Sequence, residues 1–335
     1  MSHKVKDTEY LFLSTRIRVL ERTLLTRERM ERMLDAQTNE EAVKVLVECG
    51  YPEMPVVDVD AVNAALVKMR EKVFDDLYAY APDPAMIDVF KVKYDYHNVK
   101  TILKSEAMGL DPARLLVDCG RVPPEELAEQ LKPSKDRGKS DSTPLLDAAR
   151  EARELLTASH DPQRSDCVLD RAYFREMAQL AEATGSDFLE GYVRLLVDAA
   201  NLKSLVRVLR MGKKRSFLEG ILFEGGNVSV EQVLRCTEEE DALTHVYRDS
   251  LFQQAAELGQ AAIHGGELTG FEKACDNALV RYIAASKYIP FGEQPVVAYL
   301  VAKENELTAV RIIMTGRLAG LSADTIRERL RESYV

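Results

Sequence analysis

The feature that most constrains this chain is one helical segment that the sequence contains twice. Residues 93–109 (KYDYHNVKTILKSEAMG) and 197–212 (VDAANLKSLVRVLRMG) share an Asp, an Asn three positions later, an aliphatic residue, a Lys and a final Met-Gly. Each matched pair of residues is separated by 103 positions. In the second segment apolar residues recur at i, i+3, i+4 and i+7, which predicts an amphipathic helix. A helix repeated at this distance predicts duplicated helical domains.

The similarity extends beyond these two helices. Both segments continue through a short apolar stretch to a Gly, a polar residue and a Val, at 120–122 and at 226–228, and a new helix is expected after each. Ser229 with Gln232 three residues later predicts a capping box at the start of the second new helix. Units spaced 103 residues apart are longer than the roughly 20–50 residues of solenoid repeats. We interpret them as duplicated domains, with coincidence among helix-forming sequences as the alternative.

A looser third copy is expected in the last part of the sequence. Aligning Glu306 with Asn201 brings the Gly of 314–316 (Met-Thr-Gly) close to Gly212. In this copy Lys303 stands where the other two have an Asp. The segment 320–322 (Gly-Leu-Ser) then repeats the signal of a Gly followed by a helix cap.

The N-terminal region resembles the second half of one unit. Residues 33–42 (MLDAQTNEEA) are similar to 233–242 (VLRCTEEEDA), which lie 200 positions later. The sequence therefore begins partway through a unit, and its last unit ends soon after a capped helix. We hypothesise that the two end regions supply two parts of one domain.

Helical periodicity dominates the whole chain, and alternating β-branched runs are nearly absent, so we predict an all-α protein. Long helices are predicted over 15–32, 62–80, 145–158, 241–263 and 270–287. The predicted division is an N-terminal partial unit (1–60) followed by three repeat domains (61–144, 145–264 and 265–335). The partial unit is expected to complete a ring of these domains.

The composition excludes several classes of protein. The chain is 46% hydrophobic and 30% charged, so it can bury real cores. No apolar run approaches the ~18 residues of a membrane helix, and the N-terminus lacks a signal peptide's apolar core, so a cytoplasmic protein is expected. The net charge of −10 argues against nucleic-acid binding. Five widely spaced cysteines, an odd number, predict free thiols.

A search for chemistry finds no constellation that could carry it. The residues 137–140 (RGKS) resemble the end of a phosphate loop, but Pro133 stands where the first Gly is required and no strand precedes it. The five histidines have no metal-ligand spacing. We therefore predict no catalytic, cofactor-binding or metal-binding residue and no bound cofactor, which points to a scaffold.

Two exposed segments are candidates for partner contacts. Residues 132–144 are polar and rich in Lys, Ser and Pro, which predicts a mobile surface loop and a candidate domain junction. Residues 210–215 (RMGKKR) form the densest basic cluster. This cluster is either a solvated helix end or a contact with an acidic partner or with the headgroup zone around a membrane protein.

Residues 290–335, together with 94–106 and 197–210, resemble the C subunit of the V/A-type rotary ATPases and ATP synthases, the counterpart of the d subunit in the eukaryotic vacuolar enzyme. The most specific parts are 304–311 and 326–334, and the resemblance covers essentially the whole chain. It implies three helical domains arranged as a funnel around a pseudo-threefold axis.

The resemblance also implies a function. The chain would be a non-catalytic central-stalk subunit, peripheral to the membrane, between the rotating shaft and the proteolipid ring of a machine that links ATP to proton or sodium transport. It would bind no nucleotide and no nucleic acid. Two alternatives stay open on the residues alone: a free-standing helical adaptor, and a helical enzyme whose site is assembled from scattered residues.

Overall fold

The computed structural model describes residues 5–132, 142–239 and 241–335, and over these ranges it contains helices and no strand. The prediction of an all-α protein is confirmed. The helices are α1 (Leu11–Glu21), α2 (Arg27–Asp35), α3 (Asn39–Glu48), α4 (Val59–Tyr80), α5 (Ala85–Met108), α6 (Pro124–Leu131), α7 (Pro144–Ser159), α8 (Pro162–Thr184), α9 (Asp187–Arg210), α10 (Arg215–Glu219), α11 (Val230–Arg235), α12 (Ala242–Val246), α13 (Gln253–Ile263), α14 (Leu268–Ala284), α15 (Glu293–Leu318) and α16 (Ala323–Arg329), with the short 3₁₀ helices η1 (Asp7–Tyr10) and η3 (Ala285–Tyr288).

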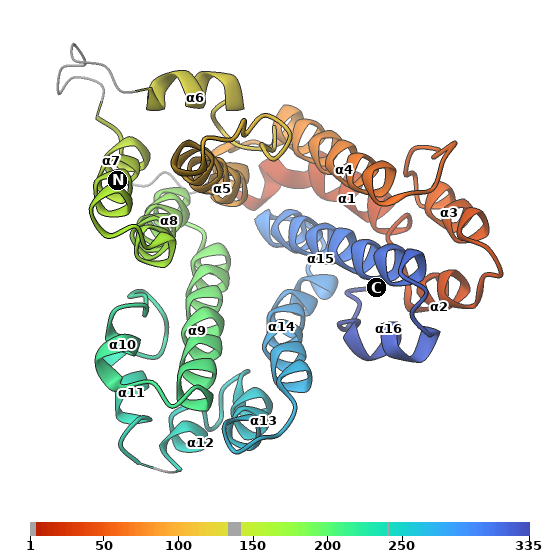
Figure 1. Cartoon of the computed structure of the whole chain (residues 1–335). Helices are drawn as coiled ribbons and strands as arrows, with labels where there is room; N and C mark the ends of the chain where they lie inside the picture. Colours follow the sequence, from red (N-terminus) through yellow and green to blue (C-terminus); the bar gives the residue numbers. More distant parts are fainter. Residues whose placement is uncertain (1–4, 133–141, 240) are drawn as a thin grey trace.

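The helices pack in three groups, each built around one long helix (Figure 1). In the first group, α5 contacts α6, α7 and α8. In the second group, α9 contacts α10, α11, α13 and α14. In the third group, α15 contacts α1, α2, α3, α4 and α16. The three long helices α5, α9 and α15 are those that carry the sequence repeat.

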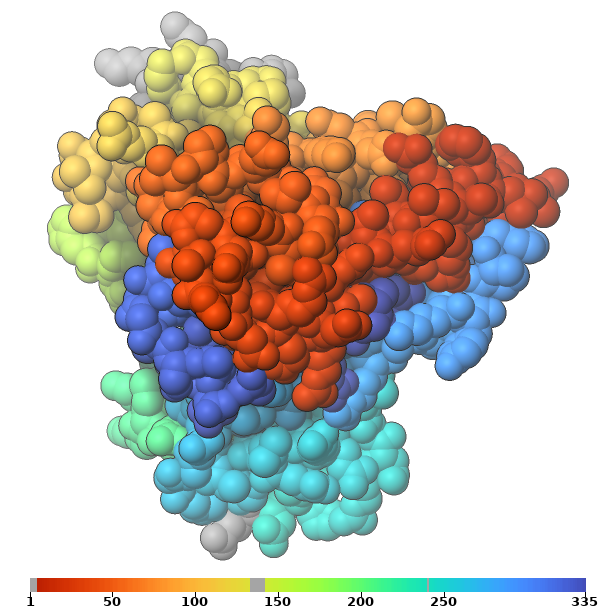
Figure 2. Space-filling view, turned by 90° about the vertical axis from the view of Figure 1, so that its right-hand side faces the viewer, coloured from red at the N-terminus to blue at the C-terminus, as the bar shows by residue number. Residues whose placement is uncertain are grey.

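The third group combines helices from opposite ends of the sequence. The N-terminal helices α1 to α4 pack on α15, and α16 packs on α2. In Figure 2 the red and orange N-terminal residues and the blue C-terminal residues lie side by side on one face of the molecule. The division into domains at 1–60, 61–144, 145–264 and 265–335 stays a prediction.

The apolar core has two parts. One part is shared by the first and third groups and contains, for example, Val92 of α5 and Ile313 of α15. The other lies within the second group and contains Leu205 of α9 and Phe271 of α14. The second group therefore has a core of its own, but the start of α9 and the end of α14 belong to the shared part.

The end of the third long helix does not lie at Gly316, which the alignment brings close to Gly212. Helix α15 continues through Gly316 to Leu318, and the residue in the left-handed region after it is Gly320, with φ +71°. The equivalent residues after α5 and α9 are Gly109 and Gly212, with φ +66° and +62°. The third copy therefore ends about one helical turn later than the other two.

Two predicted helices are each broken in two. The spacing over 15–32 predicts a continuous helix, but α1 ends at Glu21 and α2 begins at Arg27. Thr26 caps α2, because its side chain accepts a hydrogen bond from the Arg29 N–H. The helix predicted over 241–263 is likewise divided into α12 and α13. Helices predicted over 62–80, 145–158 and 270–287 are confirmed within a few residues.

Candidate functional site

Two buried side chains of α5 hold the loop that follows this helix. Asn98 is fully buried; its Nδ2 donates to the Val117 carbonyl at 2.9 Å, and its Oδ1 accepts from the Val117 N–H at 2.9 Å. Asp95 lies on the same helix face, one turn earlier. Its Oδ1 accepts from the N–H groups of Arg121 and Val122, at 2.8 and 3.2 Å. We call this pair the first clamp, and residues 110–123 the first returning loop.

Helix α9 carries the same arrangement. Asn201 donates to the Phe223 carbonyl at 2.7 Å and accepts from the Phe223 N–H at 2.9 Å. Asp198 accepts from the N–H groups of Asn227 and Val228, at 3.1 and 3.0 Å. This is the second clamp, and residues 220–229 are the second returning loop. The repeated Asp and Asn of the sequence are thus repeated because each unit must satisfy the buried main chain of its own loop.

Each clamp also explains the repeated Gly of its loop. A Cβ atom on Gly120 would lie 2.2 Å from Oδ1 of Asp95, and one on Gly226 would lie 2.2 Å from Oδ1 of Asp198. No side chain fits at either position without displacing the carboxylate. The Gly–polar–Val pattern is therefore part of the clamp: the Gly allows the close approach, and the next two residues donate their N–H groups.

Burial raises the pKa of both clamp aspartates. For Asp95 the main opposing effect is the hydrogen bond from the Arg121 side chain, at 2.7 Å. For Asp198 the opposing effects are the hydrogen bonds from Val228 and Asn227. The loop donors therefore lower the cost of keeping these carboxylates buried but do not remove it.

The repeated Lys of the two helices ties each of them to the last long helix of its group. Lys100 on α5 pairs with Asp170 on α8 at 2.5 Å, and Lys203 on α9 pairs with Asp276 on α14 at 2.5 Å. Thr308 stands at this position in α15. A second tie lies one turn further on in both groups: Lys104–Asp166 and Arg207–Glu272. These side chains are partly exposed, so each pair adds little stability and mainly fixes helix register.

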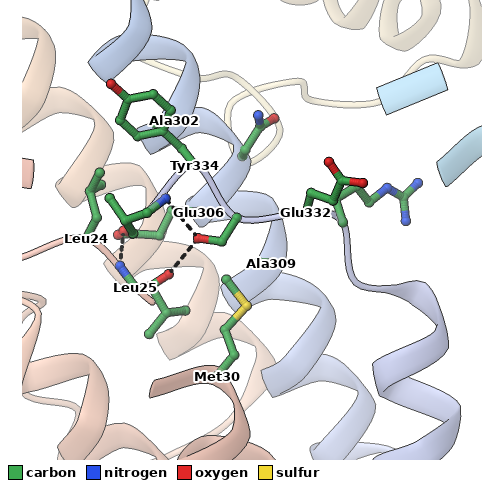
Figure 3. A pocket seen from close by; sticks show the side chains of 12 residues that line it. Leu24, Leu25, Met30, Ala302, Glu306, Ala309, Glu332 and Tyr334 are labelled. Atoms are coloured by element: carbon green, nitrogen blue, oxygen red, sulfur yellow. Dashed lines mark hydrogen bonds between the residues drawn. The ribbon is translucent and has the colours of Figure 1, made fainter. Parts of the chain in front are cut away.

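In the third copy the clamp is charged and acts on the N-terminal region. Glu306 of α15 accepts a hydrogen bond from the Leu25 N–H at 2.6 Å through Oε2. Its Oε1 accepts from the Tyr51 hydroxyl at 2.7 Å and from Lys303 Nζ at 2.6 Å. The side chains of Lys303 and Glu306 are both only 3% exposed. Figure 3 shows Glu306 beside Leu24 and Leu25.

The three clamps meet equivalent points of the chain. Val122 directly precedes the N-cap residue of α6, Val228 that of α11, and Leu25 that of α2. In each case the N–H of this residue is bound by a carboxylate on the long helix. Helix α2 thus has the contacts of α6 and α11, although it lies at the other end of the sequence from α15. This agrees with the hypothesis that the end regions supply two parts of one unit.

Residues 331–335 complete the surroundings of the third clamp (Figure 3). They line a small pocket together with residues of α15, Met30 and the Leu24–Leu25 segment. Ser333 Oγ donates to the Leu25 carbonyl at 3.4 Å. The buried carboxylate in the lining, Glu306, is already occupied by three donors. The pocket therefore lies where the N-terminal and C-terminal segments pack together, and its buried carboxylate already has its full set of hydrogen-bond donors.

The basic segment 210–215 is bound within the molecule at its two outer arginines. Arg210 donates to the carbonyls of Ala262, at 2.9 Å, and Gly266, so it caps the C-terminal end of α13. Arg215 pairs with Glu219 at 3.2 Å and with Glu238. These contacts favour the interpretation as a helix end. Most of the other candidate segment, residues 133–141 of 132–144, lies outside the described residues.

Among the described residues, no group of three or more His, Cys, Asp and Glu side chains is arranged to hold a metal ion. Nor does any helix in those ranges combine the length and the apolar character needed to cross a bilayer. The five cysteines are free thiols, with Cys167 half-buried and the others buried.

The Asp and Asn of the first two clamps are visible in the sequence as a repeat, but the repeat alone assigns them no role. The signal was present, because the spacing from the Asn to the Gly–polar–Val segment is nearly the same in both copies. The third clamp gave a weaker signal, since Glu and Lys replace Asn and Asp and the loop it binds is far away in the sequence.

Comparison with known proteins gives matches along the whole chain. The family model described as ATP synthase (C/AC39) subunit matches residues 13–329. The C subunit of the V-type sodium ATPase of Enterococcus hirae is 25% identical over 329 residues, which covers 97% of this chain and 99% of the relative. The C subunit of the A-type ATP synthase of Methanocaldococcus jannaschii is 24% identical, covering 96% and 86%. That of Haloferax volcanii is 24% identical, covering 81% of each chain.

Proposed function

This chain belongs to the ATP synthase (C/AC39) subunit family, and from that premise we propose that it is a rotor subunit of a V/A-type ATPase or ATP synthase. Subunits of this family are structural and non-catalytic, within complexes that couple ATP to ion transport. The proposed role is to join the rotating central shaft to the proteolipid ring on the cytoplasmic face of the membrane. Torque would then pass through this chain as a rigid body.

The observation that carries the proposal is the set of three clamps. A part that transmits torque must not yield between its two attachment surfaces, and loops are normally the least rigid parts of a helical protein. Here the main chain next to each of α6, α11 and α2 is bound by buried carboxylates on a long helix. Buried hydrogen bonds of this kind resist displacement because the unpaired groups are costly. The clamps therefore hold in place the loops that would otherwise be the least rigid parts of each group.

We further propose that the three groups surround a pseudo-threefold axis and form a funnel for the end of the shaft. Three sets of contacts support this arrangement: α5 with α8, α9 with α14, and α15 with α4. In each set, the long helix that carries the repeat packs against another long helix of its own group.

The test is a binding experiment on the purified, monodisperse chain. The central-shaft subunits and the detergent-solubilised proteolipid ring are immobilised separately, and the bound fraction is measured against concentration. Saturable binding to both surfaces supports a coupling subunit. Binding to only one of them contradicts coupling, and binding to neither returns the chain to the interpretation as a free-standing helical adaptor.

A further inference from the structure

The first two returning loops each continue along one chain into the next helix, but the third copy has no such continuous loop. Helix α16 begins three residues after Gly320, as α10 begins three residues after Gly212. After α10 the chain runs through the second returning loop into α11. After α16 come residues 330–335, whereas the helix in the position of α11 is α2, which is preceded by residues 24–26.

We propose that residues 330–335 are a latch: together with residues 24–26 they form a third returning loop that no peptide bond joins, and their detachment loosens the contact between the second and third groups. This proposal goes beyond the proposed function, because it concerns contacts within the chain and requires no partner.

The first support is that residues 330–335 lie on the second group as the second returning loop lies on the first. The ring of Phe223, in the second returning loop, packs against that of Phe174 on α8, with 4.6 Å between ring centroids. The Gly220 carbonyl of the same loop accepts a hydrogen bond from Arg171, also on α8. The second returning loop therefore crosses onto α8, the last long helix of the preceding group.

The equivalent contacts of the latch are made with α14. Arg331 Nε donates to Asp276 Oδ2 at 2.8 Å, and the Glu332 N–H donates to Oδ1 of the buried Asn277 at 2.9 Å. The Glu332 carboxylate pairs with Arg281 at 2.8 Å. Asp276 is also the partner of Lys203, so one carboxylate fixes both α9 and the latch to α14.

The second support is the anchor at the far end of the latch. Tyr334 is 5% exposed, and its hydroxyl lies 3.1 Å from both Ser286 Oγ and Glu21 Oε1. The ammonium of Lys287 lies over its ring, 5.0 Å from the centroid. Ser286 and Lys287 belong to η3 in the second group, and Glu21 is the last residue of α1 in the third group. Tyr334 therefore bridges two groups.

The energetics distinguish this segment from the other loops. Its ion pairs are partly exposed and each contributes little, so most of its attachment comes from burying the side chains of Leu330 and Tyr334. The second returning loop is tied to helices at both ends by peptide bonds. The latch follows α16 directly and contains no helix of its own, so its detachment unfolds no helix.

The test compares hydrogen exchange in the full chain and in Tyr334→Ala. We expect the amides of residues 21–27 and 276–288 to exchange about tenfold faster or more in the variant, because these segments lose the anchor. Amides of α5 and α6 in the first group should not change. Tyr334→Phe keeps the ring but loses the hydroxyl contacts, so it should give a smaller increase in the same two segments.

Phe223→Ala is the matched control, since it removes the aromatic contact of a returning loop that is covalently continuous. It should leave exchange in 21–27 unchanged. The proposal is overturned if Tyr334→Ala leaves both segments unchanged, or if protection falls equally in all three groups, because the segment would then be part of the global core. Neither result depends on binding to a shaft or a ring, so failure here is distinguishable from failure of the proposed function.

Discussion

At the scale of single residues, a buried carboxylate decides where each returning loop runs. Asp95 and Asp198 have no close counter-ion in common: Arg121 reaches Asp95, whereas the second copy offers the amide of Asn227 at 2.8 Å. What the two sites share is the pair of main-chain N–H donors. The sequence repeat was visible because Asp, Asn and Gly must all be retained for this geometry, while the residue after the Gly is free to differ.

Gly226→Ala tests the close approach of loop and helix. A Cβ atom there would lie 2.2 Å from Asp198 Oδ1, so the loop or the carboxylate must move. We expect the free energy of unfolding to fall by about 1–3 kcal/mol, as for other overpacked sites. Chemical denaturation measures this. Gly270→Ala is the control, because nothing lies within 4 Å of its Cβ position, and it should be neutral or slightly stabilising. Equal effects of the two changes would contradict the clamp.

The raised pKa of Asp198 predicts a pH dependence of stability. Between the unfolded pKa of about 3.9 and the higher folded pKa, the folded protein keeps a proton that the unfolded chain has lost. The contribution of Asp198 to the free energy of unfolding therefore falls as pH rises through this window. Asp198→Asn has no such proton.

The measurement is urea denaturation of both proteins from about pH 3.5 to 7. The free energy of unfolding of the unsubstituted protein minus that of Asp198→Asn should decrease as pH rises. A difference that grows with pH would mean that the loop donors outweigh burial and that the charged form is the favoured one.

At the scale of elements, the break between α1 and α2 shows what local sequence patterns cannot predict. The apolar spacing over 15–32 is helical throughout, and the break at 22–26 follows from Glu306, 281 positions away, which binds the Leu25 N–H. Thr26 as an N-cap was a local signal for the start of α2, but it was outweighed by the continuous periodicity. Helix α7, whose partner α8 is near in sequence, was predicted within one residue at each end.

The longer third helix has a similar cause. Gly316 matched the pattern of a helix end, but it is a contact site: a Cβ atom there would lie 2.7 Å from Cγ1 of Ile326 on α16. The same residue type serves two purposes, and the sequence alone does not distinguish a helix end from a close helix packing. The sequence also contains Gly320, whose position just before the next helix cap indicates the correct end of α15.

Glu306→Leu tests the third clamp. The substitution leaves the Lys303 ammonium, the Tyr51 hydroxyl and the Leu25 N–H buried with their acceptor removed, so we expect a loss of about 3–5 kcal/mol in the free energy of unfolding. The double variant Lys303→Met/Glu306→Leu should be more stable than Glu306→Leu alone, because it removes the unpaired charge. Denaturation of both variants and of Lys303→Met gives the coupling energy. Additive effects would show that the pair is not coupled.

At the scale of the whole molecule, the all-α class and the membership of the family were both predicted from the sequence. The assembly of the third group was only a hypothesis, because helix periodicity carries no information about which helices meet across nearly the full length of the chain. The latch was not predicted, since residues 330–335 are too few to show a pattern.

The two-part core predicts two units of local unfolding. Phe271 is fully buried within the core of the second group, and Ile313 is fully buried within the core shared by the other two groups. In native-state hydrogen exchange, Phe271→Leu should lower protection in α13 and α14 more than in α4 and α5, and Ile313→Val should do the reverse. Uniform loss of protection in both variants would mean that the chain opens as one cooperative unit.

The contact between α15 and α4 limits how this architecture can change over evolutionary time. A solenoid has open ends, so duplication of one repeat lengthens it without disturbing the others. Here the last long helix packs on helices from the start of the sequence. A fourth copy inserted by duplication would have to separate these surfaces before it could dock. Growth by whole units would therefore have to break this contact, whereas sequence drift within each unit leaves it in place.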